Sequence, residues 1–303
     1  MQSGVIFLVI AMSLTPGLDG LSKVLSVDFS PFLVCFLRYF AAGIVALFAS
    51  RALGQPIHVP REGRAHQLVL TALLVGAMTF LITALSMVPL ALATGGFLIA
   101  PLVSTVLSIF YLREPVTRAR VIGSLISLIG AVVITKPAAG IEVGTLFALA
   151  GGAMLGTYLA VSRGAVNKGG PMSSLAVQCL FGSVLLAPLA FFHGLPSLTL
   201  DQFFVVLGLG ILSAVTHYLT VLAFEKADAS VLSPFLYFNL IAALVVGYLW
   251  FNEVPNAWSV LGLSLIAVGG IVTIMPGHVA RRATARFLRM PSGIFRKSDH
   301  LTI

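Results

Sequence analysis

Ten long apolar stretches separated by short polar connections dominate this chain. Each has about 20 residues, the length that an α-helix needs to cross the hydrocarbon core of a bilayer. They are continuous runs rich in Leu, Ala and Gly rather than short alternating segments, so they predict helices. We therefore expect an all-α integral membrane fold with ten transmembrane helices, at residues 4–24, 32–50, 67–87, 92–112, 118–135, 143–162, 173–194, 202–223, 229–251 and 257–275.

The pattern occurs twice along the chain. Residues 111–137 read YLREPVTRARVIGSLISLIGAVVITKP, and residues 250–276 read WFNEVPNAWSVLGLSLIAVGGIVTIMP. The chain therefore contains an internal repeat with five helices in each copy. A shift of 139 positions superposes matching residues of the two copies: Glu114 on Glu253, Val121 on Val260, Gly123 on Gly262, Gly130 on Gly269 and Pro137 on Pro276.

The two copies differ in the charge of their connections. The first connection carries Arg113, Arg118 and Arg120, whereas the second carries no Lys or Arg. Because basic loops stay on the cytoplasmic side, the two loops lie on opposite sides of the membrane and the halves are inverted. A cytoplasmic N-terminus leaves only Lys23 and Lys136 of the basic residues outside.

Three segments follow from this pattern. The first five-helix repeat takes residues 1–140, the second takes 141–276, and a basic cytoplasmic tail takes 277–303. Inverted repeats of this kind are the architecture of secondary transporters, which move one half against the other. We expect a multi-pass membrane protein with both termini in the cytoplasm, and alternating access through a central cavity between the repeats.

Composition excludes several classes of function. Of the residues, 58% are hydrophobic and 9% charged, so lipid surrounds most of the surface. The net charge of +8 reflects the inner loops and the tail, not a nucleic-acid partner. No Walker-type phosphate loop occurs, which excludes transport driven by ATP. We expect no cofactor, no bound metal and no obligate protein partner; the expected partners are a small-molecule substrate and the bilayer.

Two other classes remain open. A membrane-embedded enzyme would need clustered carboxylates or histidines, whereas the six histidines are scattered along the chain. We therefore expect no enzymatic activity. A channel would lack the alternation between two gates, and saturable counterflow would distinguish it from a carrier.

Ionisable groups inside apolar stretches are costly in lipid and mark candidate functional positions. Asp19 and Arg38 lie at similar depths on the first two helices, which allows an ion pair. The pair either locks these helices together or acts as an outer gate or a clamp for a zwitterionic amino acid. Glu114 and Glu253 lie at helix ends, where we expect them to cap the helix or pair locally with arginines such as Arg118.

Seven further side chains are candidates for the substrate pathway. They combine aromatic rings with hydrogen-bonding groups inside the spans: Thr79, Thr83, Phe97, Tyr158, His217, Tyr237 and Asn239. Such a lining suits a flat amphipathic ligand, because rings stack while amides and hydroxyls orient an amino or carboxyl group. Tyr158 and His217 are expected to meet across a central space. Alternatively, His217 is a packing residue and the threonines return hydrogen bonds to their own helix.

Three prolines predict helix kinks. Pro16 interrupts the first helix, Pro101 lies near the middle of the fourth, and Pro234 lies in the first third of the ninth. A proline inside a helix removes a backbone hydrogen bond, so these helices are candidates for the moving or pore-lining set. Leu240 stands where the second repeat would match Pro101, so we expect helices four and nine to bend differently.

These residues resemble a known family. The features that carry the resemblance are Pro16-Gly17, Lys23, Ser30-Pro31 and Arg38 in the first two helices, and the paired glycines that follow Glu114 and Glu253. Together they resemble the EamA-type members of the drug/metabolite transporter (DMT) superfamily, over nearly the whole chain. The resemblance implies a ten-helix transporter of the bacterial inner membrane.

Among these transporters the chain is most similar to the YddG-type exporters of aromatic and other amphipathic amino acids. The resemblance therefore implies export of small amphipathic metabolites, including aromatic amino acids. Export of drugs or cationic compounds, or of sugar phosphates, remains an alternative, although sugar phosphates would need more cations than Arg38 in the membrane. No series of intramembrane carboxylates predicts a proton relay, which favours gradient-driven export, while His217 and Asp19 keep proton coupling open.

Overall fold

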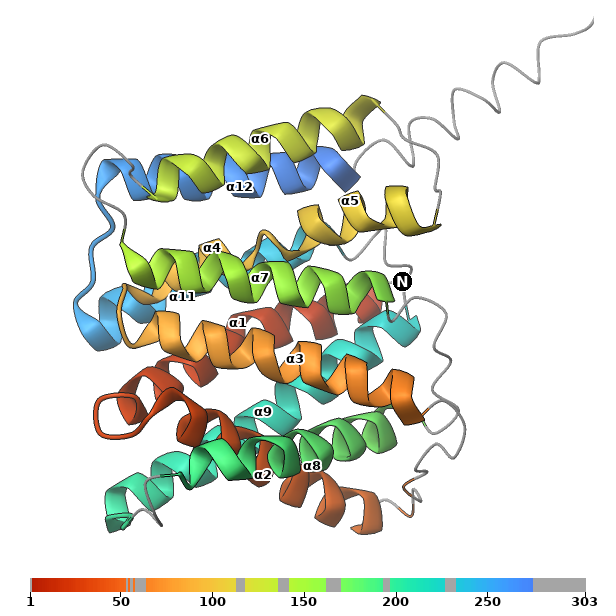
Figure 1. Cartoon of the computed structure of the whole chain (residues 1–303), viewed down its shortest axis with the longest axis vertical. Coiled ribbons are helices and arrows are strands. Elements are labelled where there is room, and N and C mark those ends of the chain that lie inside the picture. The colour runs from red at the N-terminus through yellow and green to blue at the C-terminus, as the bar shows by residue number, and fades with distance from the viewer. Residues whose placement is uncertain are drawn as a thin grey trace, which may run out of the picture.

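The chain forms a single bundle of helices that run roughly side by side (Figure 1). The structure is a computed structural model. The described part of the chain is helical and contains no strand. It comprises residues 2–52, 54, 57, 64–112, 118–135, 142–161, 170–192, 197–226 and 233–274.

The helices reproduce the ten predicted spans, which confirms the fold class. Two of the spans consist of two helical segments each: α4 and α5 form the fourth, and η1 and α11 form the ninth. Five of the helices, α1, α2, α3, α7 and α9, are long and apolar enough to cross a membrane by themselves. The bounds are α1 Gln2–Leu25, α2 Pro31–Ala52, α3 Arg64–Leu85, α4 Leu90–Phe97, α5 Ala100–Leu112, α6 Arg118–Thr135, α7 Val143–Val161, α8 Gly170–Ala190, α9 Leu200–Lys226, η1 Ser233–Tyr237, α11 Phe238–Phe251 and α12 Ala257–Ile274.

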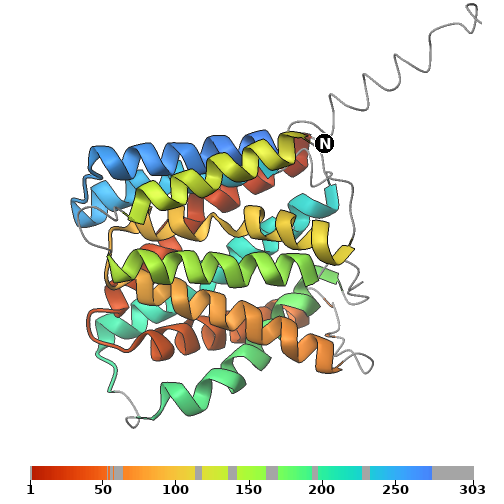
Figure 2. The same ribbon diagram turned by 45° about the horizontal axis from the view of Figure 1, so that its top comes forward.

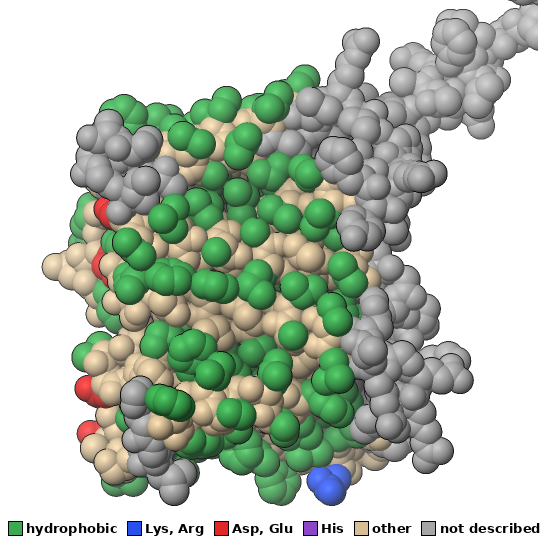
Figure 3. Space-filling model, in the orientation of Figure 1, with side chains coloured by type: hydrophobic (Ala, Val, Ile, Leu, Met, Phe, Trp, Pro, Cys, Tyr) green, Lys and Arg blue, Asp and Glu red, His purple; other side chains and the backbone are tan. Residues whose placement is uncertain are grey.

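Apolar side chains cover the described outer surface, as Figure 3 shows for one face. Leu125, Val184 and Leu249 are each about half exposed or more, whereas Asp19 and Arg38 are buried. This distribution is the reverse of that in a water-soluble protein, and it fits a bundle surrounded by lipid. The turn between α11 and α12 lies opposite the N-terminus, and we call this end of the bundle the Glu253 end (Figures 1 and 2).

The packing of the helices shows the relation between the halves. The repeat makes α1 equivalent to α7, α2 to α8, α3 to α9, and α6 to α12. Under this exchange each major contact maps onto another contact or onto itself: α3 packs on α7 as α9 packs on α1, α2 packs on α8, and α6 packs on α12. The halves are therefore two inverted five-helix repeats related by a pseudo-twofold axis.

Close glycine contacts join α6 to α12, which run side by side in Figure 2. A Cβ atom on Gly130 would lie within 3 Å of the Gly262 carbonyl oxygen, and one on Gly269 would lie within 3 Å of the Gly123 carbonyl oxygen. These two contacts are exchanged by the shift of 139 positions. Small residues therefore let the two backbones meet at the symmetry axis.

The two broken spans break at the same position in the repeat. The turn that separates α4 from α5 begins at Leu98, and η1 gives way to α11 after Tyr237, which is 139 positions further on. Spans four and nine nevertheless differ in structure. In the fourth span a turn separates two α-helices, whereas in the ninth a 3₁₀ helix leads directly into one α-helix. Pro101 is the second residue of α5, where a missing N–H is tolerated.

The other two prolines occupy different settings. Pro234 is the second residue of η1 and follows Ser233, the first described residue of the ninth span. Pro16 lies inside α1, which continues from Gln2 to Leu25 as one helix. The first helix is therefore not divided into two segments at Pro16, and the kink expected there stays a prediction.

Candidate functional site

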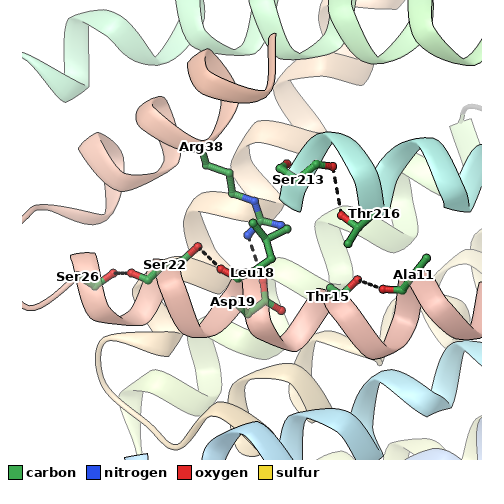
Figure 4. Close-up of polar contacts among 9 residues, drawn as sticks. All are labelled: Ala11, Thr15, Leu18, Asp19, Ser22, Ser26, Arg38, Ser213 and Thr216. Carbon is green, nitrogen blue, oxygen red and sulfur yellow. Dashed lines mark hydrogen bonds and ion pairs between the residues drawn. The ribbon is translucent and has the colours of Figure 1, made fainter. Parts of the chain in front are cut away.

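A buried ion pair joins the first two helices. Arg38 Nη1 of α2 lies 3.1 Å from Asp19 Oδ1 of α1, to which it donates a hydrogen bond (Figure 4). The exposed fraction is 2% for Asp19 and 9% for Arg38. The pair that the sequence allows is therefore formed, and each charge compensates the other inside the bundle.

The guanidinium group of Arg38 is also part of a cavity wall. This cavity has a volume of about 140 Å³ and lies among α2, α3, α7, α8 and α9. Gln178 Nε2 donates a hydrogen bond of 3.3 Å to Tyr158 Oη within it. The lining residues are Arg38, Tyr39, Leu74, Met78, Tyr158, Gln178, Cys179, Ser213 and His217.

The cavity contains some of the predicted pathway residues. Tyr158 and His217 both line it, as their depths in the helices suggest. Thr79 and Thr83 are not among its lining residues. The Thr79 hydroxyl donates to the Val75 carbonyl oxygen at 2.9 Å, and the Thr83 hydroxyl donates to that of Thr79 at 2.8 Å. The two threonines thus return hydrogen bonds to their own helix.

The remaining three pathway candidates lie in other contacts. The Tyr237 side chain is buried against α12, where its hydroxyl occupies the space that a Cβ on Gly270 would take. Phe97 packs at the edge of the apolar cluster that contains Ala148. Asn239 lies at the start of α11, and its buried Oδ1 has no hydrogen-bond partner among the described residues. None of the three is among the residues that line the cavity.

Several residues that line the cavity were not predicted from the sequence, although the repeat identifies them. Leu74 and Ser213 are 139 positions apart, and so are Met78 and His217. All four line the cavity. Given His217 as a candidate, the repeat identifies Met78 as its counterpart. The positions one helical turn earlier, Leu74 and Ser213, then follow as neighbours on the same helix faces. The cavity lies on the pseudo-twofold axis.

A second polar cluster ties three elements together at the Glu253 end. Lys23 Nζ of α1 lies 2.8 Å from Glu253 Oε1 and donates to the Val88 carbonyl oxygen at 2.7 Å. Glu253 Oε2 accepts a 2.7 Å hydrogen bond from the Leu90 backbone N–H. The Lys23 ammonium also lies 5.5 Å from the ring centre of Phe251. We call Lys23, Val88, Leu90 and Glu253 the Glu253 cluster.

This cluster corrects one of the two alternatives expected for Glu253: its carboxylate accepts the N–H of Leu90, the first residue of α4, but its ion pair is not local. Glu253 pairs with Lys23, a residue of the other repeat, and not with a nearby arginine. Its carboxylate neutralises a cation that approaches from α1, so its partner is set by helix packing and not by the local sequence. Glu114 lies outside the described residues.

The sequence and the fold agree with one family of transporters. The sequence pattern of the EamA-like transporter family matches residues 2–136 and residues 142–275. The chain belongs to this family. It is therefore a multi-pass membrane protein and a secondary transporter of small metabolites, not an enzyme. The two matched segments correspond to the two halves that the helix packing relates.

Several similar proteins are informative. The chain is 26% identical over 250 residues to an S-adenosylmethionine uptake transporter of Rickettsia bellii, covering 82% of this chain and 85% of the relative. It is 25% identical over 242 residues to a riboflavin transporter of Vibrio cholerae, covering 78% and 80%. A solved crystal structure has the same fold, with a TM-score of 0.66, 24% identity, and coverage of 92% of this chain and 97% of that one.

Proposed function

We propose that this EamA-like transporter carries small amphipathic metabolites that contain an amino-acid group, aromatic amino acids among them, through the central cavity. The observation that supports this most is the Arg38 guanidinium group in the cavity wall. Arginine has five N–H donors in a planar fork, and Asp19 engages Nη1 through a single oxygen atom. The other donors suit a substrate carboxylate, which guanidinium binds in two-point geometry.

The rest of the lining fits the same class of substrate. Tyr39 and Tyr158 offer aromatic faces, while Ser213 and His217 offer hydrogen-bonding groups. The relatives named above are transporters of S-adenosylmethionine and riboflavin, and both molecules join a planar ring system to polar groups. A cavity that combines rings with one cation is suited to such ligands, and amino acids with aromatic side chains share this chemistry.

In this proposal the concentration gradient of the substrate sets the direction of transport. The sequence contains no Walker-type phosphate loop, so in this proposal a substrate that accumulates in the cytoplasm leaves through the carrier down its gradient. This agrees with the resemblance to YddG-type exporters. The same carrier takes up a substrate that is more concentrated outside, as the name of the Rickettsia relative states for that protein.

Alternating access in this proposal requires the Glu253 cluster to break and re-form. In this structure the cluster joins α1 to the turns before α4 and α12, all at one end of the bundle. The positive-inside rule places the Glu253 end outside the cell. Lys23 and Glu253 then act as an outer gate, while the Asp19–Arg38 pair contributes to the substrate site.

Proteoliposomes that contain the purified full-length protein test the function. We expect saturable uptake and counterflow of labelled Phe and Trp without a pH gradient, and weaker transport of Thr and Lys. The variant Arg38→Gln should lose transport of Phe but keep residual transport of the amino alcohol that lacks the carboxylate. S-adenosylmethionine and riboflavin complete the panel. The absence of saturable transport for every amino acid overturns the proposal, and transport of riboflavin alone replaces it.

A further inference from the structure

The cavity has two unlike walls that the pseudo-twofold axis relates. One wall carries the lining residues of α9, which packs on α1, and the other carries those of α3 and α7, which pack on each other. The repeat exchanges α1 with α7 and α9 with α3, so each wall is the counterpart of the other. A symmetric protein would have the same side chains on both walls.

The first wall is polar. Ser213 and His217 of α9 line the cavity on this side. Arg38 belongs to α2, but its guanidinium group extends to Asp19 of α1 (Figure 4), and Ser213 of α9 lines the same cavity as Arg38. We call Arg38, Ser213 and His217 the polar wall.

The second wall carries apolar groups at the equivalent positions. Leu74 matches Ser213 and Met78 matches His217, each pair being separated by 139 positions. Tyr158 of α7 matches Asp19 of α1 by the same shift. The Tyr158 hydroxyl accepts a hydrogen bond from Gln178 of α8, so the polar end of this side chain is held at α8 while the residue lines the cavity. We call Leu74, Met78 and Tyr158 the apolar wall.

We infer that this difference fixes how the substrate lies: its charged end contacts the polar wall and its side chain contacts the apolar wall. The inference rests on the proposed function and assigns Met78 and Leu74 as determinants of side-chain selectivity, and Ser213 and His217 as determinants of end-group selectivity. The reverse orientation would place a carboxylate against the Leu74 and Met78 side chains, which offer no donor, and would remove it from the Arg38 guanidinium group, the cation of the cavity lining. It would also place an apolar side chain against the Arg38–Asp19 ion pair.

Two selectivity ratios, measured in proteoliposomes with the full-length protein, test this assignment. The first ratio compares Phe with Ala and reports on the side chain. The second compares Phe with phenylalaninol, which lacks the carboxylate, and reports on the charged end. Met78→Ala should change the first ratio by about tenfold, because a few methylene groups in an apolar pocket discriminate by roughly that factor. The second ratio should not change.

Substitutions in the polar wall should have the converse effect. Ser213→Ala and His217→Gln should lower the preference for Phe over phenylalaninol and leave the Phe to Ala ratio unchanged. Leu74→Ala is a second apolar-wall variant if Met78→Ala does not fold. Leu68→Ala is the matched control, since Leu68 lies on the same helix as Leu74 but is 54% exposed on the outer surface.

The outcomes separate the inference from the proposed function. If the wild-type protein transports Phe but Met78→Ala or Leu74→Ala changes the end-group ratio as much as the side-chain ratio, the inference is wrong and the function stands. The same holds if Ser213→Ala changes the Phe to Ala ratio. If the wild-type protein transports no amino acid, the proposed function fails and this inference fails with it.

Discussion

Arg38 lies in the cavity wall and is also one half of a buried ion pair. Removing one partner of such a pair leaves an uncompensated charge, which costs about 3–5 kcal/mol of stability. We therefore expect Asp19→Asn and Arg38→Gln each to lower the temperature of thermal unfolding in detergent. The double variant Asp19→Asn/Arg38→Gln should be more stable than Asp19→Asn, because it removes both charges, yet it should not transport Phe.

The conservative change Arg38→Lys separates these two roles of Arg38. Lysine keeps the charge for Asp19 but lacks the planar fork that binds a carboxylate at two points. The expected result is a raised KM for Phe with a smaller loss of thermal stability than in Arg38→Gln. Equal KM values for wild type and Arg38→Lys would contradict a direct contact between Arg38 and the substrate carboxylate.

The native cysteine in the cavity allows a test of the outer gate that we propose for the Glu253 cluster. Cys179 lines the cavity and is 7% exposed, while Cys35, the other cysteine, is fully buried. Glu253→Gln removes the charge that holds Lys23, so we expect Cys179 to react faster with a membrane-impermeant maleimide added outside intact cells. Phe should slow this reaction by occupying the cavity.

Two variants control this labelling experiment. Asp201→Asn neutralises an exposed carboxylate at the start of α9 and should leave the labelling rate at the wild-type value. Cys179→Ser should abolish the Cys179 signal. A labelling rate in Glu253→Gln that equals the wild-type rate would show that the cluster does not limit access to the cavity.

The glycine contacts between α6 and α12 predict that equivalent substitutions in the two repeats destabilise the protein equally. A Cβ on Gly130 or Gly269 would meet backbone atoms of the facing helix within 3 Å, and backbone cannot yield as a flexible side chain does. Gly130→Ala and Gly269→Ala should therefore each cost about 1–3 kcal/mol, as overpacked contacts do. The two variants should lower the unfolding temperature by similar amounts, because the pseudo-twofold axis exchanges the two sites.

The neighbouring residue Val268 provides the control, because its side chain is 49% exposed on the outer surface. Val268→Ala should unfold at nearly the wild-type temperature. An unfolding temperature lowered by Gly269→Ala but not by Gly130→Ala would mean that the two halves of this interface are not equivalent.

The helices and their repeat could be predicted from the sequence because both depend on local properties, namely apolar length and the spacing of matching residues. The cavity lining depends on how each helix is rotated about its axis, which depth along a span does not determine. Tyr237 and His217 both lie inside their spans, yet His217 faces the cavity and Tyr237 faces α12. The Lys23–Glu253 pair joins residues from opposite repeats, so no local pattern predicts it.

The orientation of the whole protein in the membrane can be tested directly. The positive-inside rule predicts that the turn between α11 and α12 faces outward and that the end of α2 faces the cytoplasm. In a background without Cys35 and Cys179, Val254→Cys should react with an impermeant maleimide in intact cells. Arg51→Cys should react only after the cells are opened. Both positions are exposed, so the reverse result would mean the opposite orientation.

The contact between α6 and α12 is self-complementary, whereas the residues that the two halves contribute to the cavity are not alike. Ser127 of α6 donates its hydroxyl proton to the carbonyl oxygen of Ile266, the residue that occupies its own place in the second repeat. Such a contact is isologous, the kind that two identical subunits make about a dyad. A homodimer of five-helix chains would place every substitution on both sides of its cavity at once. A single chain that carries both halves has no such constraint, and here Met78 and His217 differ at equivalent positions while the contact between α6 and α12 is self-complementary.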